Sequence, residues 1–187
     1  MQTNVLTTRY SFVAQAFHWL TAGLVLVAFL ISPGGSEARV YSATAEGTRV
    51  LHESIGALVF AVVALRLAWR MFNHPPELPG QSAWMNRAAK SVHIALYVLL
   101  FLTPVTAVVG AWYEGHSISL YGIGDIVPAL TQAHDLGATI ANVHGFLGDA
   151  ILWIAGLHAA AALYHHFFLR DAVLAAMVPG LQPPHFL

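Results

Sequence analysis

The fold of this chain is decided by residues 142–169, which read NVHGFLGDAILWIAGLHAAAALYHHFFL. No charged side chain occurs from residue 150 to residue 169, and a helix that spans a bilayer needs about 20 mostly apolar residues. Two histidines, His144 and His158, interrupt this apolar stretch 14 residues apart. Ionisable side chains at membrane depth are costly and usually functional. The segment therefore predicts a membrane helix that carries a functional site.

Three further windows are long and apolar enough to cross a membrane: 11–32, 51–72 and 91–113. Turn-forming stretches rich in Gly and Pro separate the windows, and no internal repeat or second domain is visible. We expect an all-α integral membrane protein in which residues 1–187 form a single four-transmembrane-helix bundle. The first window is also compatible with a signal peptide, but it lacks a charged start and a small-x-small cleavage site.

The composition agrees with a membrane protein. Apolar residues make up 57% and charged residues 9% of the 187 residues, whereas soluble domains carry about 25% charged residues. The mean hydropathy of +0.64 argues against a disordered chain and against an ordinary water-soluble domain. A net charge of −1 without a basic tract argues against nucleic acid as a partner. The absence of cysteine excludes disulfides, thiolate-bound iron–sulfur clusters and cysteine nucleophiles.

The basic residues predict the orientation of the bundle, because cytoplasmic loops are enriched in Lys and Arg. With four spans, both termini lie on one side, and that side collects six of the eight basic residues: Arg9, Arg66, Arg70, Arg87, Lys90 and Arg170. We therefore expect both termini in the cytoplasm of a multi-pass bacterial inner-membrane protein. The opposite loops carry two basic and six acidic residues, a net charge of −4.

Four histidines lie at membrane depth and are candidate ligands. His144 and His158 share one helix face and are separated by about 21 Å along the axis. Counted from the nearest cytoplasmic arginine, His18 lies at a depth of about 14 Å and His158 at about 18 Å. His52 lies at about 27 Å and His144 at about 39 Å by the same measure. The smaller mismatches predict the pairs His18/His158 on the inner side and His52/His144 on the outer side.

Two such pairs on facing helices suit flat cofactors of the porphyrin type, since helical bundles bind cofactors between side chains of neighbouring helices. Small residues near the ligands, Gly23, Gly56 and Gly148, give a planar ring room to approach the backbone. Zinc fits less well, because its ligands usually have short local spacings and no HExxH or HxxxH pattern is present. For any single histidine, a hydrogen bond to a neighbouring helix is an equally good explanation.

Other polar residues cluster near the inner pair. His93, His165, Lys90 and Arg170 are candidate contacts for a quinone or for a heme propionate. A solvated helix end explains His93 equally well, and an interfacial position beside Arg170 explains His165. We expect the loop residues His116 and His134 to be solvated.

These residues resemble the bacterial cytochrome b561 family of small di-heme membrane cytochromes. The resemblance covers nearly the whole chain and is carried by HWL (18–20), LHESIG (51–56), HIALYVLLFLTPVTAVVG (93–110), VHGFLG (143–148) and GLHAAAALYHH (156–166). It implies two b hemes as cofactors, with His18, His52, His144 and His158 as the axial ligands that bind the iron. It also implies ubiquinone as a substrate or bound quinone. The chain is most similar to the superoxide:ubiquinone oxidoreductase branch, from which its acidic outer loops depart.

Three functions follow as hypotheses. The first is electron transfer across the membrane between a periplasmic donor and the quinone pool. The second is an enzyme, a superoxide oxidase that reduces ubiquinone. The third is a heme-free metal carrier or membrane scaffold. The family resemblance favours superoxide as the donor, whereas the acidic outer loops favour a basic protein such as a c-type cytochrome. Both donors, like quinone and membrane lipid, are expected partners.

Overall fold

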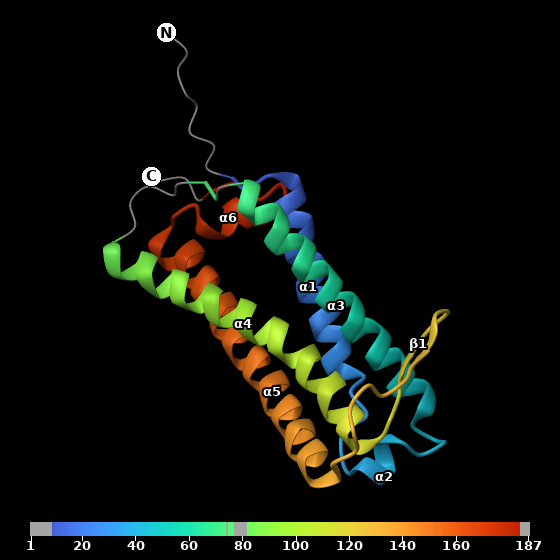
Figure 1. Cartoon of the computed structure of the whole chain (residues 1–187). Coiled ribbons are helices and arrows are strands. Elements are labelled where there is room, and N and C mark those ends of the chain that lie inside the picture. The colour runs from blue at the N-terminus through green and yellow to red at the C-terminus, as the bar shows by residue number, and fades with distance from the viewer. Residues whose placement is uncertain (1–8, 74, 77–81, 184–187) are drawn as a thin grey trace.

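The computed structural model describes residues 9–73, 75–76 and 82–183 of the chain. Four long helices, α1 (Phe12–Leu30), α3 (Glu46–Phe72), α4 (Ala83–Glu114) and α5 (His134–Tyr164), form the body of the protein (Figure 1). Helix α5 continues into a π-helical turn, η1 (His165–Leu169). All four long helices are apolar and long enough to cross a membrane, in agreement with the predicted four-helix membrane bundle.

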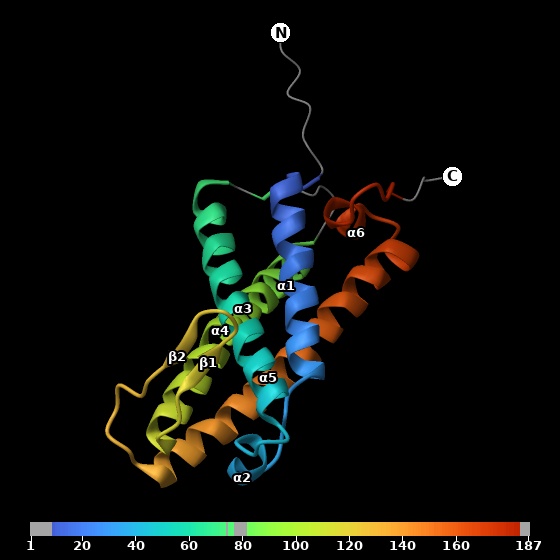
Figure 2. The ribbon, with the colours of Figure 1, turned by 90° about the vertical axis from the view of Figure 1, so that its right-hand side faces the viewer.

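Short elements lie at the two ends of the bundle. At one end, which we call the α6 end, helix α6 (Val173–Met177) lies against the start of α1 (Figure 2). At the other, the α2 end, lie α2 (Glu37–Val40) and a hairpin of β1 (Ile118–Leu120) and β2 (Gly124–Ile126). The strands pair antiparallel, with Ile118 opposite Ile126. Backbone N–H groups of Ser119 and Tyr121 donate hydrogen bonds to Glu53 and Ser54 of α3, which attaches the hairpin to the bundle.

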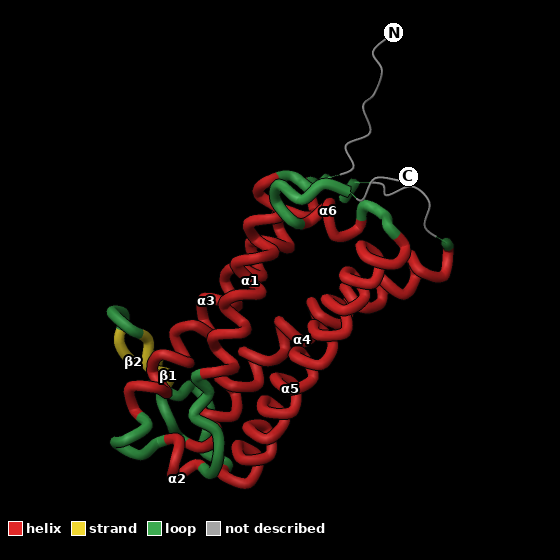
Figure 3. The backbone as a smooth tube through the Cα atoms, turned by 180° about the vertical axis from the view of Figure 1, so that it is seen from behind, coloured by secondary structure: helices red, strands yellow, loops and turns green. Residues whose placement is uncertain are grey.

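The helices associate as two pairs, α1 with α3 and α4 with α5, which are joined more sparsely to each other (Figure 3). Helices α4 and α5 approach closely at Gly110 and Gly137, since a Cβ at Gly137 would lie 3.0 Å from the Gly110 carbonyl oxygen. The two pairs meet around a small core of Val59, Val63, Leu100 and Ile151. Most other large apolar side chains are exposed, as expected where the surrounding solvent is lipid.

Local sequence explains where helices end. The Ser11 hydroxyl accepts a hydrogen bond from the Ala14 N–H and caps α1. Gly115 ends α4 with φ +85°, a conformation that favours glycine. The helix windows predicted from apolarity begin too late in three cases: α3 begins at residue 46 rather than 51, α4 at 83 rather than 91, and α5 at 134 rather than 142. The added turns carry polar side chains, which extend a helix beyond the bilayer without any cost of burial.

Candidate functional site: two pairs of histidines

The α6 end contains a group of three imidazoles from three helices. The rings of His18 (α1) and His158 (α5) have centroids 6.3 Å apart and planes inclined by 73°. His93 (α4) lies nearer to His158, with a centroid distance of 5.2 Å. Of the two interpretations of His93, the solvated helix end is excluded, because α4 begins ten residues earlier and leaves this side chain half-buried.

The α2 end contains the second pair. His52 (α3) and His144 (α5) have ring centroids 6.1 Å apart, with planes inclined by 88°. The structure therefore brings together the same two pairs that the comparison of helix depths predicts. Each pair joins one helix of the α1–α3 pair to α5, so that both sites lie between the two helix pairs.

Hydrogen bonds fix the rings at the α2 end. The Nδ1 atoms of His52 and His144 lie 2.8 Å from the carbonyl oxygens of Ala28 and Thr103, respectively. A carbonyl oxygen only accepts, so each Nδ1 is the protonated nitrogen and donates. Each Nε2 then keeps its lone pair. This tautomer, held by a backbone carbonyl, is the one that neutral histidine ligands of metals commonly adopt.

The α6 end is electrostatically different. The guanidinium of Arg66 donates to His18 Nδ1 at 3.2 Å, because an arginine has no acceptor. Arg66 and Arg70 also lie over the ring of Tyr97, at 5.4 and 5.9 Å from its centroid. This pair therefore lies beside the positive charge of Arg66. To bind a metal through Nε2, the neutral His18 ring must release Arg66 and carry its proton on Nδ1 instead of Nε2.

Three glycines lie four or five residues after the histidines along their helices. A Cβ built at Gly23, Gly56 or Gly148 meets no other atom within 4 Å, so no side chain of the described residues fills these positions. The contrast is with Gly137, where a Cβ would lie 2.6 Å from the side chain of Glu114. The donor set, its neutral tautomer at the α2 end and the open glycines together fit a large planar group better than a small ion.

The remaining predicted contacts lie near the α6 end. His165 Nδ1 lies 2.5 Å from a carboxylate oxygen of Asp171, whose other oxygen accepts from the Val173 N–H. Lys90 and Arg170 are exposed. The contact between Arg66 and His18 is not predicted by the sequence. The one sequence signal for this contact is the position of Arg66, which lies within the apolar window 51–72, four residues before Arg70.

A second polar region lies at the α2 end. Tyr41 stacks on His116 with a centroid distance of 3.4 Å, and the guanidinium of Arg49 lies 5.1 Å from the Tyr41 ring. Arg49 also forms an ion pair with Glu53 at 2.9 Å. Burial, followed by the charge of Glu53, raises the pKa of Tyr41 to about 12. The expectation that His116 is simply solvated is wrong, because its ring is half-buried and bonded to Glu37.

Comparison with known proteins agrees with this architecture. The family model described as "Prokaryotic cytochrome b561" matches residues 9–180. "Cytochrome b561 homolog 2" of Escherichia coli (strain K12) is 30% identical over 171 residues, covering 91% of each chain. "Cytochrome b561 homolog 1" of the same organism is 27% identical, covering 91% of this chain and 97% of the homolog. "Probable superoxide oxidase CybB" of Yersinia pestis is 29% identical, and the match covers 91% of this chain and 96% of the Yersinia protein.

Proposed function

Because the chain belongs to the prokaryotic cytochrome b561 family, we propose that it is a di-heme b-type cytochrome that transfers electrons between a periplasmic donor and the quinone pool. Family membership itself makes the chain a multi-pass inner-membrane protein of electron transport that binds b-type heme. The number of hemes, their ligands and the two electron partners are the proposal.

One observation carries the proposal: two pairs of imidazoles at the separation that an iron atom requires. A metal–nitrogen bond of about 2 Å and an imidazole radius of about 1.1 Å on each side place the ring centroids about 6.2 Å apart. The observed centroid distances are 6.3 Å for His18/His158 and 6.1 Å for His52/His144. We therefore assign one heme b to each pair.

The residues of the chain have distinct roles at the two sites. Heme supplies one-electron oxidation and reduction when it is bound. His52 and His144 are held in the ligating tautomer by the Ala28 and Thr103 carbonyls. At the α6 end, the positive charge of Arg66 stabilises an added electron, because opposite charges attract strongly in a medium of low dielectric constant. Electron flow from the α2 end to the α6 end follows from this asymmetry.

The test is the heme content of purified variants. Wild type is expected to contain two hemes per chain and to show the split α-bands of low-spin heme. His158→Ala should lose the heme at the α6 end and keep the other, and His144→Ala should do the reverse. Two hemes retained in either variant would overturn the ligand assignment. A wild-type protein without low-spin heme would favour the hypothesis of a heme-free metal carrier or membrane scaffold.

We place quinone reduction at the α6 end, near His93, His165, Lys90 and Arg170. Reduced quinone needs protons as well as electrons, and the His165–Asp171 hydrogen bond offers a proton-donating pair beside this end. His165→Ala should keep both hemes and lower the rate of quinone reduction. If His93→Ala and His165→Ala both leave that rate unchanged, the quinone site lies at the α2 end instead.

The orientation of the bundle is part of the proposal. The described ends of the chain lie together at the α6 end, where Arg9 donates a hydrogen bond to the Leu181 carbonyl. The excess of basic residues at this end favours a cytoplasmic location for both termini, with the α2 end in the periplasm. Alkaline phosphatase fused to the C-terminus should therefore be inactive in cells, and an active fusion would reverse the orientation.

Superoxide oxidation coupled to ubiquinone reduction is the second candidate function. It is favoured by the 29% identity to a protein named "Probable superoxide oxidase CybB". The acidic loops at the α2 end oppose it, since they repel an anion. Arg49, the cation nearest His52 in sequence, is paired with Glu53 and adds little net attraction.

A further inference from the structure

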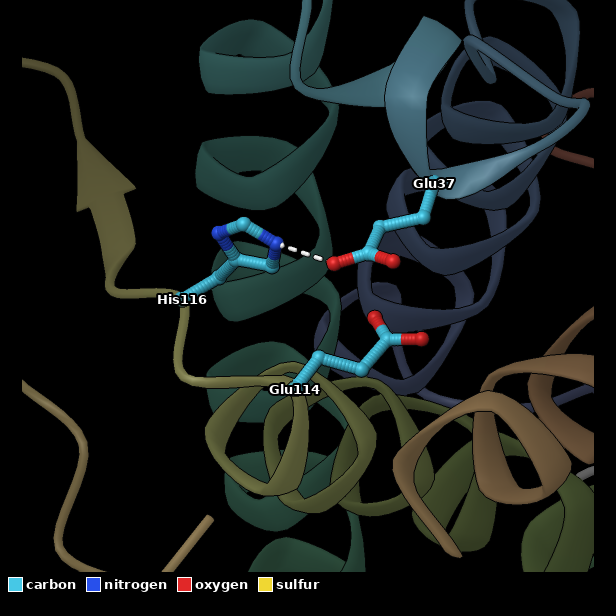
Figure 4. Close-up of side chains that lie close together, drawn as sticks. All are labelled: Glu37, Glu114 and His116. Carbon is cyan, nitrogen blue, oxygen red and sulfur yellow. Dashed lines mark hydrogen bonds and ion pairs between the residues drawn. The ribbon is translucent and has the colours of Figure 1, made fainter. Parts of the chain in front are cut away.

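A polar cluster at the α2 end brings together side chains from two segments that lie far apart in the sequence. Glu37 belongs to α2, Glu114 is the last residue of α4, and His116 follows α4 (Figure 4). One potential ligand atom from each of the three lies within 4.8 Å of the others. His116 Nε2 lies 2.7 Å from Glu37 Oε1, and His134 Nε2, at the start of α5, lies 3.6 Å from Glu37 Oε2.

Glu114 is the unusual member of this cluster. It is only 8% exposed, and its carboxylate forms no hydrogen bond or ion pair with any residue that the structure describes. Figure 4 shows this carboxylate turned toward that of Glu37. A protonated His116 would compensate Glu37 but leave Glu114 as a second, uncompensated negative charge. Two carboxylates that face each other at this distance repel, so the arrangement favours a further positive charge between them.

We propose that Glu37, Glu114 and His116, with His134 as a fourth donor, form a binding site for a divalent transition metal ion of the zinc type. Imidazole nitrogen and carboxylate oxygen are ligands that zinc prefers. Bond lengths of about 2.1 Å in a tetrahedron separate the ligand atoms by about 3.4 Å. The donor atoms of Glu37, Glu114 and His116 lie within 4.8 Å of one another, and His134 Nε2 lies 3.6 Å from the second Glu37 oxygen. Side-chain movements of the three core residues, and a further movement of His134, bring the donors to this separation.

The charges and the position of the site support this assignment. One divalent cation neutralises the two carboxylates while both imidazoles remain neutral. The net charge of −4 on the surrounding loops attracts cations to this face. The metal would bridge α2, the end of α4 and the start of α5. Helix α5 also carries His144. The metal site is distinct from the proposed heme sites, whose histidines it does not use.

Zinc binding to the heme-loaded, tag-free protein tests the proposal. The protein is treated with a chelator, dialysed and titrated with Zn²⁺ by isothermal calorimetry at neutral pH. We expect one zinc ion per chain. Glu114→Gln and His116→Gln should each weaken binding by about 10- to 100-fold or more. His134→Gln should also weaken it, and an unchanged affinity would remove His134 from the ligand set.

A matched control is Glu46→Gln, which removes the same charge from an exposed carboxylate of this face outside the cluster. Its zinc affinity should stay within about twofold of wild type, since it changes only the long-range field. X-ray absorption at the zinc edge should show imidazole among the ligands, and less of it in His116→Gln. The proposal is overturned if wild type takes up no zinc, or if Glu114→Gln and His116→Gln bind it as wild type does. Unchanged heme spectra in all variants separate these outcomes from misfolding or from failure of the heme assignment.

Discussion

His158 has two imidazole neighbours, and their distances suit different roles. The His18 ring lies 6.3 Å away, which leaves room for an iron atom between the rings, whereas the His93 ring lies 5.2 Å away, which does not. We expect His18→Ala to lose the heme at the α6 end and His93→Ala to keep both hemes. Because His93 lies beside His158, its loss should lower quinone reduction by about 100- to 10,000-fold, the range typical of a lost proton-transfer group.

Heme content by absorbance, with quinone reduction followed by stopped flow, distinguishes these two variants. Loss of one heme in His93→Ala together with two hemes in His18→Ala would make His93 the partner of His158. The His166→Ala variant is a suitable control, because His166 is half-buried at the same end but lies in η1 and outside the three-imidazole group.

Tyr41 provides a prediction about pH. Burial and the neighbouring carboxylates raise its pKa from 10.0 to about 12. Between these values, the unfolded chain ionises this phenol and the folded chain does not, so ionisation favours unfolding. The stabilising contribution of Tyr41 is therefore complete below pH 10 and is lost as the pH rises toward 12.

The measurement is the phenolate absorbance of wild type minus that of Tyr41→Phe, recorded against pH. The difference should titrate near pH 12, and a midpoint near 10 would contradict the buried, acid-flanked environment of this ring. Tyr121→Phe is the control, because Tyr121 is 68% exposed in the hairpin of the same end.

At the scale of elements, the contact between α4 and α5 depends on two glycines without side chains. A Cβ at Gly137 would lie 2.8 Å from the backbone nitrogen of Glu114 and 3.0 Å from the carbonyl oxygen of Gly110. Backbone atoms cannot move aside cheaply, so Gly137→Ala must push the helices apart. We expect the free energy of unfolding to fall by about 1–3 kcal/mol, as for other overpacked contacts.

Denaturation of the detergent-solubilised protein checks this value. Gly47→Ala is the matched control, because Gly47 lies in α3 and a Cβ there meets nothing within 4 Å. That variant should be as stable as wild type, or more stable by up to about 1 kcal/mol, since alanine favours the helix. Equal stability of the two variants would contradict the close approach of α4 and α5.

At the scale of the whole molecule, the charge of the α2 end discriminates between electron donors. Six acidic and two basic residues give this face a net charge of −4. Such a field repels superoxide and attracts a basic protein, and added salt screens both effects. We expect the rate of heme reduction by superoxide to rise with ionic strength, and the rate with a basic c-type cytochrome to fall.

Stopped-flow mixing at several salt concentrations makes the comparison. A superoxide reaction that is fast at low salt and slows as salt rises would show local steering of the anion and favour the superoxide oxidase. Glu46→Gln and Asp125→Asn each remove one exposed negative charge of this face. Each variant should make the rates of heme reduction by superoxide and by the basic cytochrome depend less on ionic strength.

The sequence by itself determined which parts of the chain cross the membrane and which histidines lie at depth. Both follow from local properties, since apolarity decides whether a segment enters lipid and the helical rise fixes distances along one axis. It misplaced the starts of α3, α4 and α5, because hydrogen bonds within a helix continue where the apolar side chains end. The family resemblance added the expectation of heme but no geometry.

Only the tertiary structure decided which side chains face one another across different helices. The rotation and tilt of one helix against its neighbour depend on packing at contacts such as Gly110 and Gly137, which no local pattern reveals. For this reason the contact of Arg66 with His18 and the position of His93 beside His158 emerged only from the folded chain. The cluster of Glu37, Glu114 and His116 is the extreme case, because 79 residues separate Glu37 from His116 and α2 must meet the end of α4 to form it.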